Sequence, residues 1–125
     1  MNEYPKDLLE LLNIQIGCII KINRLRRGIS QHDLSLILDL NPTAIGRIER
    51  AEVTSGWDRI YILSQELKIP FSNLFELLPE KDLLLIVDEL FSLEQKLNDE
   101  KKEFYRILIS KIKGKYTVLK IMDNS

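Results

Sequence analysis

The feature that most constrains this chain is a pair of short helices separated by a connection of only two residues. Ser30 is a good N-cap for the first helix, which we predict over residues 30–38. The dipeptide Asn41-Pro42 supplies an N-cap and a first-turn proline for the second, which we predict over residues 41–49. Because so short a connection leaves no room for a gradual change of direction, the second helix must cross the first at a steep angle and expose one face.

The apolar residues of this pair indicate which faces turn inward. Leu34, Ile37 and Leu38 follow helical spacing in the first helix, and Ile45 and Ile48 do so in the second. We expect all five to be buried.

Apolar spacing also predicts helices on either side of the pair. These additional helices are expected at residues 7–12, 14–27, 55–68 and 72–78. Asn13 should end the first of them or cap the next, Gly28 should end the second, and Ser55 with Asp58 offers a capping box for the third.

Composition limits the chemistry open to the chain. With 125 residues, 45% apolar and 30% charged, it has the makeup of one compact globular domain, with or without an appendage. Cys18 is the only cysteine and His32 the only histidine, so neither an internal disulfide nor a clustered metal site is expected. The start, MNEYPKD, is unlike a signal peptide, and no apolar run is long enough to span a bilayer. We therefore expect a cytoplasmic protein without cofactor or membrane partner.

The net charge of −1 hides a local asymmetry. Residues 15–60 carry seven basic against five acidic side chains, and six of the seven are arginine. Most of the basic residues elsewhere are lysine, with Arg106 as the exception. Arginine suits bidentate contact with phosphate and guanine, so this window weakly favours a nucleic-acid partner.

Three stretches resemble the Cro/repressor-type (XRE) helix-turn-helix family. They are ISQHDLS at 29–35, NPTAIGRIER at 41–50 and LKIPFSNLF at 67–75, and the likeness extends over residues 14–78. The resemblance implies an all-α protein with a five-helix DNA-binding domain, in which helix 41–49 enters the major groove.

The resemblance also implies roles for individual residues. The base-facing positions correspond to Asn41, Pro42, Thr43, Ala44 and Arg47. The phosphate-facing positions correspond to Gln31 and Arg50, and Thr43 could bind a phosphate instead of a base. His32, beside Gln31, and Arg27, at an exposed helix end, are further candidates for phosphate contact from their position and charge, although a solvated side chain is the favoured interpretation for both. Gln31 should also brace the third helix, and Arg24 with Glu49 should form a partly buried ion pair between the first and third helices.

This sequence departs from the family pattern at three positions. Asp39 stands at the turn position that usually carries glycine, so it is expected to take a left-handed backbone. Gly46 lies inside the recognition helix, where it either permits close approach to DNA or contributes no contact. Ala51 replaces the family glycine after that helix, and we expect this replacement to be neutral.

The C-terminal third predicts two further helices. Asn98 is a good N-cap, so we expect helices over 81–97 and 99–113, with Gly114 ending the second. Residues 1–13 would then be a short leader helix and residues 114–125 a tail.

Apolar residues recur at spacings of three and four along these helices, as in a coiled coil or bundle. The first helix contributes Leu83, Ile86, Leu90, Leu93 and Leu97, and the second contributes Phe104, Ile107, Leu108 and Ile112. So many exceed what a small domain needs, which favours a dimerisation segment over residues 80–113. The alternative is a helical hairpin that packs on the chain's own DNA-binding domain.

These observations together predict a homodimeric repressor that binds double-stranded DNA at a pseudo-palindromic operator, with two recognition helices ~34 Å apart or a small multiple of that. One alternative is the antitoxin of a toxin–antitoxin pair, which would bind a toxin through its C-terminal part. Another is a protein-interaction module that has lost DNA binding, in keeping with the near-neutral charge. Catalysis has no support, because the sequence lacks a Gly-rich phosphate loop and an HExxH motif. The lone His32 is the only histidine that could serve a nucleophile as a base.

Overall fold

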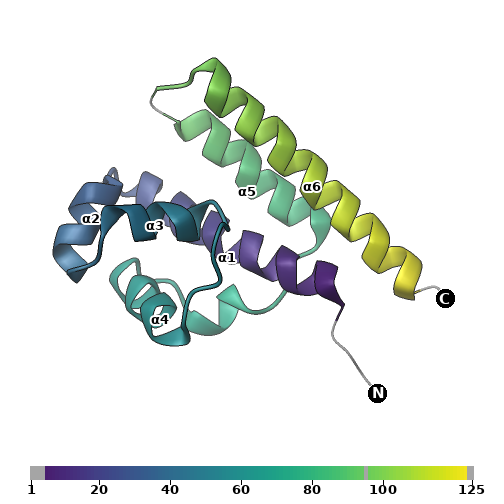
Figure 1. Cartoon of the computed structure of the whole chain (residues 1–125), viewed down its shortest axis with the longest axis horizontal. Coiled ribbons are helices and arrows are strands. Elements are labelled where there is room, and N and C mark those ends of the chain that lie inside the picture. The colour runs from purple at the N-terminus through teal and green to yellow at the C-terminus, as the bar shows by residue number, and fades with distance from the viewer. Residues whose placement is uncertain (1–4, 95, 124–125) are drawn as a thin grey trace.

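The computed structural model describes residues 5–94 and 96–123, and this part of the chain is all-α, with no strand (Figure 1). No helix in it is both long and apolar enough to cross a membrane. In chain order the elements are α1 (Lys6–Arg26), α2 (Gln31–Leu38), α3 (Pro42–Glu49), α4 (Trp57–Glu66), the 3-10 turn η1 (Phe71–Leu74), α5 (Glu80–Leu93) and α6 (Asp99–Asp123).

The two short helices predicted over residues 30–38 and 41–49 form as α2 and α3. The Ser30 hydroxyl accepts a hydrogen bond from the Asp33 backbone N–H (2.9 Å), and the Asn41 side chain accepts one from the Thr43 N–H (2.8 Å). Asp39 takes the left-handed backbone expected of it, with φ at 53°. Its N–H and that of Leu40 both bond to the Ser35 carbonyl, which ends α2 and starts the turn.

The separate leader helix predicted before Asn13 is wrong, because α1 is continuous over 21 residues. Nothing in this stretch removes a backbone donor or forces a turn. The Asn13 amide lies inside α1 and donates to the carbonyls of Ala51 (3.4 Å) and Val53 (3.2 Å), so it ties α1 to the chain after α3. Residues 1–4 of the predicted leader lie outside the described part.

Two predictions about the middle of the chain need correction. The helix predicted over 55–68 forms as the shorter α4, but it begins at Trp57 with Gly56 as its N-cap and no side-chain cap, so the predicted capping box of Ser55 and Asp58 is wrong. The helix predicted over 72–78 is reduced to η1. The buried Gln15 side chain bonds to the backbone where the rest of the predicted helix would have been. Its amide donates to the Leu74 and Glu76 carbonyls, and its side-chain oxygen accepts from the Leu78 N–H.

The buried face of α2 is narrower than the sequence suggests. Leu34, Ile45 and Ile48 are buried as predicted and Leu38 is half-buried, but Ile37 is 55% exposed. The buried face of α2 is formed by Leu34, Ser35 and Leu38. Ile37 lies to one side of this face and is therefore outside the contact.

The C-terminal helices α5 and α6 lie side by side and run in opposite directions, as two helices rather than one rod (Figure 1). The predicted end at Gly114 is wrong: α6 continues through it to Asp123, so the described part of the 114–125 segment is helical and not a tail. Beyond Gly114, Tyr116 is buried and its hydroxyl donates to the Leu78 carbonyl, which stabilises these extra turns. Leu97, expected in the first helix, lies past the end of α5 at Leu93.

Helix α1 lies between the α5–α6 hairpin and helices α2 to α4 (Figure 1). It contributes to a hydrophobic core on each side. Toward the C-terminal hairpin it buries Leu11, Ile14, Cys18 and Ile22, which pack with Leu83, Val87, Leu90, Tyr105, Ile112 and Tyr116. Toward α2, α3 and α4 it buries Ile16 and Ile20, which pack with Leu34, Ile45, Ile48, Ile60, Leu63, Leu67, Ile69 and Leu74. The hairpin and the α2–α4 region therefore share one helix as a common wall.

At Gly17 the backbone of α1 lies close to the end of α3. A Cβ atom at this position would lie 2.5 Å from the Ile48 carbonyl oxygen and 2.7 Å from that of Glu49. These are backbone atoms, so they cannot turn aside as a flexible side chain could.

We therefore predict that Gly17→Ala lowers the free energy of unfolding by about 1–3 kcal/mol, although alanine is the better helix former. Gly114→Ala is the matched control, because Gly114 is also inside a helix but has nothing within 4 Å of the added Cβ. It should raise stability by about 1 kcal/mol. Urea denaturation of both variants tests this, and a stabilised Gly17→Ala would contradict the close contact.

Candidate nucleic-acid interface

Helix α3 buries one face and exposes the other. Ile45 and Ile48 are buried in the core, whereas Asn41, Thr43 and Arg47 are exposed. Of the other two residues predicted to face bases, Pro42 is exposed and Ala44 is half-buried. Four of the five predicted base-facing residues are therefore exposed on α3 or at its N-cap, and the fifth, Ala44, is partly covered.

A shallow hollow of about 370 Å³, which we call the α3 hollow, lies beside this exposed face. Its wall on α3 is formed by Ala44 and Arg47. The opposite wall is the loop to α4 and the start of α4, with Val53, Thr54, Ser55, Gly56, Asp58 and Arg59. Two guanidinium groups and two hydroxyl groups thus surround one concave surface, with Asp58 as its single carboxylate.

Arg47 and Arg59 differ from the other arginines of the described residues. The guanidinium groups of the others have partners within the chain: Arg24 on Glu49, Arg26 on Glu89, Arg27 on the Glu66 carbonyl, Arg50 on Glu52 and Arg106 on Glu103. Within residues 5–94 and 96–123, those of Arg47 and Arg59 make no hydrogen bond or ion pair. The pKa of the Glu52 carboxyl is nevertheless lowered by its hydrogen bond to Arg50 and, to a smaller extent, by the nearby charge of Arg47. Arg47 and Arg59 therefore keep all their donors available for a ligand in the α3 hollow.

The four residues predicted to contact phosphate are only partly brought together. Gln31, His32 and Arg50 line a larger groove of about 760 Å³. Its other charged lining residues are of both signs: Lys21, Arg24, Lys96 and Lys101 with Glu49, Glu94 and Glu100. Arg27 does not line it; its guanidinium donates to the last turn of α4 at the Glu66 carbonyl (2.6 Å). This contact places a cation at a helix C-terminus, where the helix dipole favours it.

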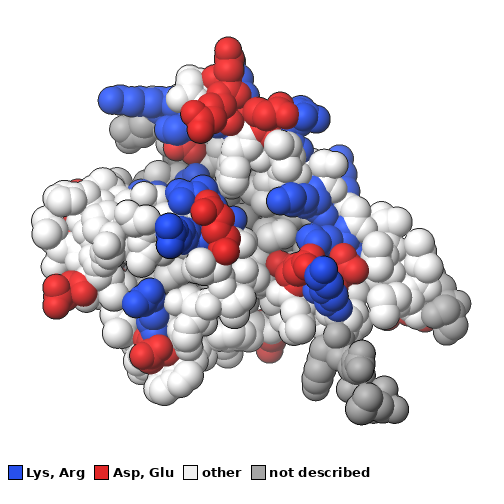
Figure 2. Space-filling model, viewed as in Figure 1, with Lys and Arg blue, Asp and Glu red and all other residues white. Residues whose placement is uncertain are grey.

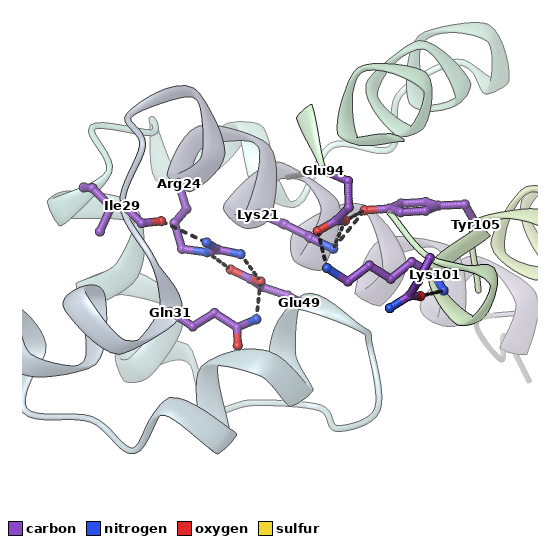
Figure 3. A network of polar contacts seen from close by, with 9 residues as sticks. Lys21, Arg24, Ile29, Gln31, Glu49, Glu94, Lys101 and Tyr105 are labelled. Carbon is purple, nitrogen blue, oxygen red and sulfur yellow. Dashed lines mark hydrogen bonds and ion pairs between the residues drawn. The ribbon is translucent and has the colours of Figure 1, made fainter. Parts of the chain in front are cut away.

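Behind α3, a buried polar network fixes the helix to its neighbours (Figure 3). Arg24 of α1 donates to both carboxylate oxygens of Glu49, from Nε at 2.7 Å and from Nη2 at 2.9 Å. A third donor, Nη1, reaches the Ile29 carbonyl at 2.9 Å, and Gln31 Nε2 donates to Glu49 at 2.8 Å. The predicted ion pair and the predicted bracing by Gln31 are both confirmed.

Gly46 makes room for this bracing. A Cβ there would lie 2.9 Å from Arg50 Nη1 and 3.3 Å from Gln31 Oε1, and Gly46 is buried. The glycine therefore serves the contact between α2 and α3 and does not lie on the exposed face. Ala51 is also not neutral as predicted: its φ of 57° puts a Cβ-bearing residue in the left-handed region that favours glycine.

A second polar cluster joins α1 to the hairpin (Figure 3). Lys21 donates to the Tyr105 hydroxyl (2.9 Å) and pairs with Glu94 (3.3 Å), which also accepts from Tyr105 (2.6 Å) and Lys101 (3.3 Å). Burial alone would raise the pKa of Glu94, but the Tyr105 hydroxyl and the two ammonium groups outweigh it and hold the pKa below its ordinary value. Burial and the Glu94 carboxylate together raise the pKa of Tyr105. The polar groups of this cluster therefore bind one another, and their contacts hold the hairpin against α1.

The charges on the face that carries α3 are mixed. Figure 2 shows Lys and Arg side chains next to Asp and Glu side chains, without one continuous basic area. Any nucleic-acid contact on this face would therefore depend on a few placed groups more than on a strong overall field.

Other reactive groups are few. Cys18 is buried, and burial raises the pKa of its thiol to about 12, so it packs as an apolar residue. Among the described residues, no three His, Cys, Asp or Glu side chains are grouped so that they could hold a metal ion.

The residues predicted for dimerisation lie mostly inside the chain. Leu83 and Leu90 are buried against α1, Ile86, Leu93, Phe104 and Leu108 are half-buried beside the same core, and Leu97 is 37% exposed. The structure therefore has the hairpin packed on the chain's own α1, the arrangement that the sequence left as the alternative. The buried members of the set are not available to a second subunit in this arrangement.

Sequence reasoning missed several residues that shape this interface. Arg59, Thr54 and Ser55 complete the α3 hollow, but they lie outside the predicted third helix. Gly17 had a visible signal, since a glycine inside a predicted helix often marks a close backbone contact. The cluster around Lys21 had none, because its partners are more than seventy residues away along the chain.

Comparison with known proteins found no match to this chain among family models, curated proteins or solved structures.

We predict that Glu49→Gln clearly lowers the melting temperature, because it leaves the Arg24 charge buried without its counter-ion. Removing one partner of a buried pair costs about 3–5 kcal/mol. The Glu49 side chain is 1% exposed and that of Arg24 7%.

The matched control is Glu89→Gln. Glu89 binds Arg26 through two similar hydrogen bonds of 2.6 and 2.7 Å, but the two side chains are 38% and 50% exposed. Because solvent screens an exposed pair, this change should affect stability much less. Equal melting temperatures for Glu49→Gln and the wild type would contradict the role assigned to the buried pair.

Proposed function

We propose that residues 14–78 form a helix-turn-helix domain of the Cro/repressor type and that the chain is a sequence-specific double-stranded-DNA-binding regulator, a homodimeric repressor. The observation that carries the proposal is Arg47. Its guanidinium is exposed, makes no hydrogen bond or ion pair among the described residues, and lies on the solvent face of a short helix that follows α2 after only three residues, 39–41.

The chemistry of the exposed α3 face fits the major groove. Free arginine donors can bind the O6 and N7 acceptors of guanine together, which makes Arg47 the residue best suited to direct base contact. Asn41 uses its side-chain oxygen as the N-cap, so its amide N–H groups remain free to donate. Thr43 offers a hydroxyl to a base or a phosphate and a methyl group to thymine.

The surroundings of α3 suit the DNA backbone. Gln31, His32 and Arg50 lie along one edge of the helix pair and would meet phosphates on one side. Arg59, with the hydroxyls of Thr54 and Ser55, would meet them across the α3 hollow. Phosphate contacts of this kind set the register of the protein on the duplex, so that Arg47 can discriminate among bases.

The buried pair of Arg24 and Glu49 supports this function indirectly. Base contacts require side chains held to within a fraction of an ångström by rigid elements. Glu49 ends α3 and is bonded to both α1 and α2, so the helix cannot rotate without breaking a buried ion pair. The proposed recognition helix is therefore presented in one orientation before DNA arrives.

We predict that Arg47→Ala weakens binding to a site selected from random duplex DNA by about 1–3 kcal/mol, while non-specific binding at low salt changes little. Gln31→Ala should instead weaken binding to all sequences about equally. Gel-shift titrations at fixed salt measure both effects.

The matched control is Arg106→Ala, which removes an exposed arginine of α6 that pairs with Glu103 and lies outside the α3 hollow. It should leave specific binding unchanged. An Arg47→Ala protein that binds the selected site as the wild type does would contradict the assignment of α3. A wild-type protein that shifts no duplex at low salt would favour the protein-interaction module over DNA binding.

A further inference from the structure

The side of the hairpin that does not face α1 carries an apolar groove of about 640 Å³ between α5 and α6, which we call the outer groove. Leu84, Leu85 and Ile109 line it, and Leu85 is 56% exposed. An exposed leucine beside two half-buried apolar residues on adjacent helices is a surface that burial would stabilise.

The two walls of the outer groove differ in their balance of charge. The α5 wall carries Glu80, Lys81 and Asp88, and the α6 wall carries Lys113 and Lys120. At one end, Lys120 of α6 already pairs with Glu80 of α5 across the groove at 3.1 Å. Asp88 and Lys113, in contrast, have no ion-pair partner among the described residues, although both line the groove.

This arrangement is complementary to itself. In a two-fold dimer, every contact from residue i to residue j is repeated from j to i. If a second copy places its α6 wall against the first copy's α5 wall, Asp88 meets Lys113 twice, and the two Leu85 side chains are covered together. A single pairing thus gives Asp88 and Lys113 a partner each and covers the apolar residues between them.

We propose that the outer groove is the dimer interface and that its occupant is a second copy of this chain. The inference deepens the proposed homodimeric regulator, and it replaces Leu83 and Leu90, which are buried in the chain's own core, with Leu84, Leu85 and Ile109. Dimerisation then needs no rearrangement of the hairpin, because α5 and α6 stay packed on α1.

Charge reversal tests the proposal, with the oligomeric state measured by light scattering on the full chain at tens of micromolar. The wild type should have a mass of twice 14.6 kDa. Asp88→Lys alone, or Lys113→Asp alone, should raise the dimer dissociation constant about tenfold or more, because two attractive contacts become repulsive. The double variant should regain the wild-type constant. An equimolar mixture of the two single variants should also dimerise, because each then supplies the charge that the other lacks.

Controls keep folding and association apart. Lys102→Asp reverses a charge on the exposed side of α6 outside the groove and should leave the dimer intact. Leu85→Gln should weaken the dimer, whereas Ile107→Gln, at another exposed apolar residue of the hairpin, should not. Circular dichroism melts verify that each variant is folded.

A monomeric wild type overturns the proposal and leaves the groove to another protein, as the antitoxin alternative would predict. Single variants that dimerise as the wild type does, or a double variant that does not recover, also overturn it. Failure here is distinguishable from failure of the DNA-binding proposal, because a monomer can still shift random duplex at low salt.

Discussion

The close backbone contact between α1 and the end of α3 is the constraint on which the rest of the structure depends. Gly17 lets the carbonyls of Ile48 and Glu49 approach α1 to a distance that any Cβ would block. Two turns further along α1, Arg24 binds the Glu49 side chain. The first contact sets how deep α3 lies and the second sets its rotation, so the exposed face of α3 is defined from behind by α1.

Helix α1 also forms one wall of the hairpin core, so the same helix that contacts α3 packs against α5 and α6. Leu11, Ile14 and Ile22 pack toward the hairpin from the same helix that holds α3. Lys21 adds a polar connection: its ammonium group lies 5.2 Å from the Tyr105 ring centre and pairs with Glu94. The hairpin therefore forms a single body with the proposed DNA-binding region, which would let a dimer made through α5 and α6 fix the spacing of two α3 helices.

The sequence predicted well what local chemistry decides, and less well what distant contacts decide. Ser30, Asn41 and Asp39 define α2, the turn and α3 through bonds to their own neighbours, and the structure matches them. The 3-10 turn where a helix was predicted depends on Gln15, some sixty residues away, which captures the backbone around Leu78.

The candidate site likewise has parts that the sequence could predict and parts that it could not. Periodicity separates the exposed Arg47 from the buried Ile45 and Ile48, so this part of the interface could be predicted. The apolar residues that recur at spacings of three and four along α5 could not be assigned a partner from spacing alone. A helix of the same chain and a helix of a second copy would present the same apolar surface to them. Only the fold shows that α1 covers Leu83 and Leu90 and leaves Leu85 exposed.

We propose that DNA contacts the exposed face of α3 and its surroundings. This is tested by the change in backbone amide NMR shifts when ¹⁵N-labelled protein is titrated with a short duplex at low salt. We expect changes concentrated at residues 31–32, 41–50 and 53–59, with α6 beyond Ile109 unaffected. Shift changes confined to α5 and α6, or none at any residue, would contradict this proposal.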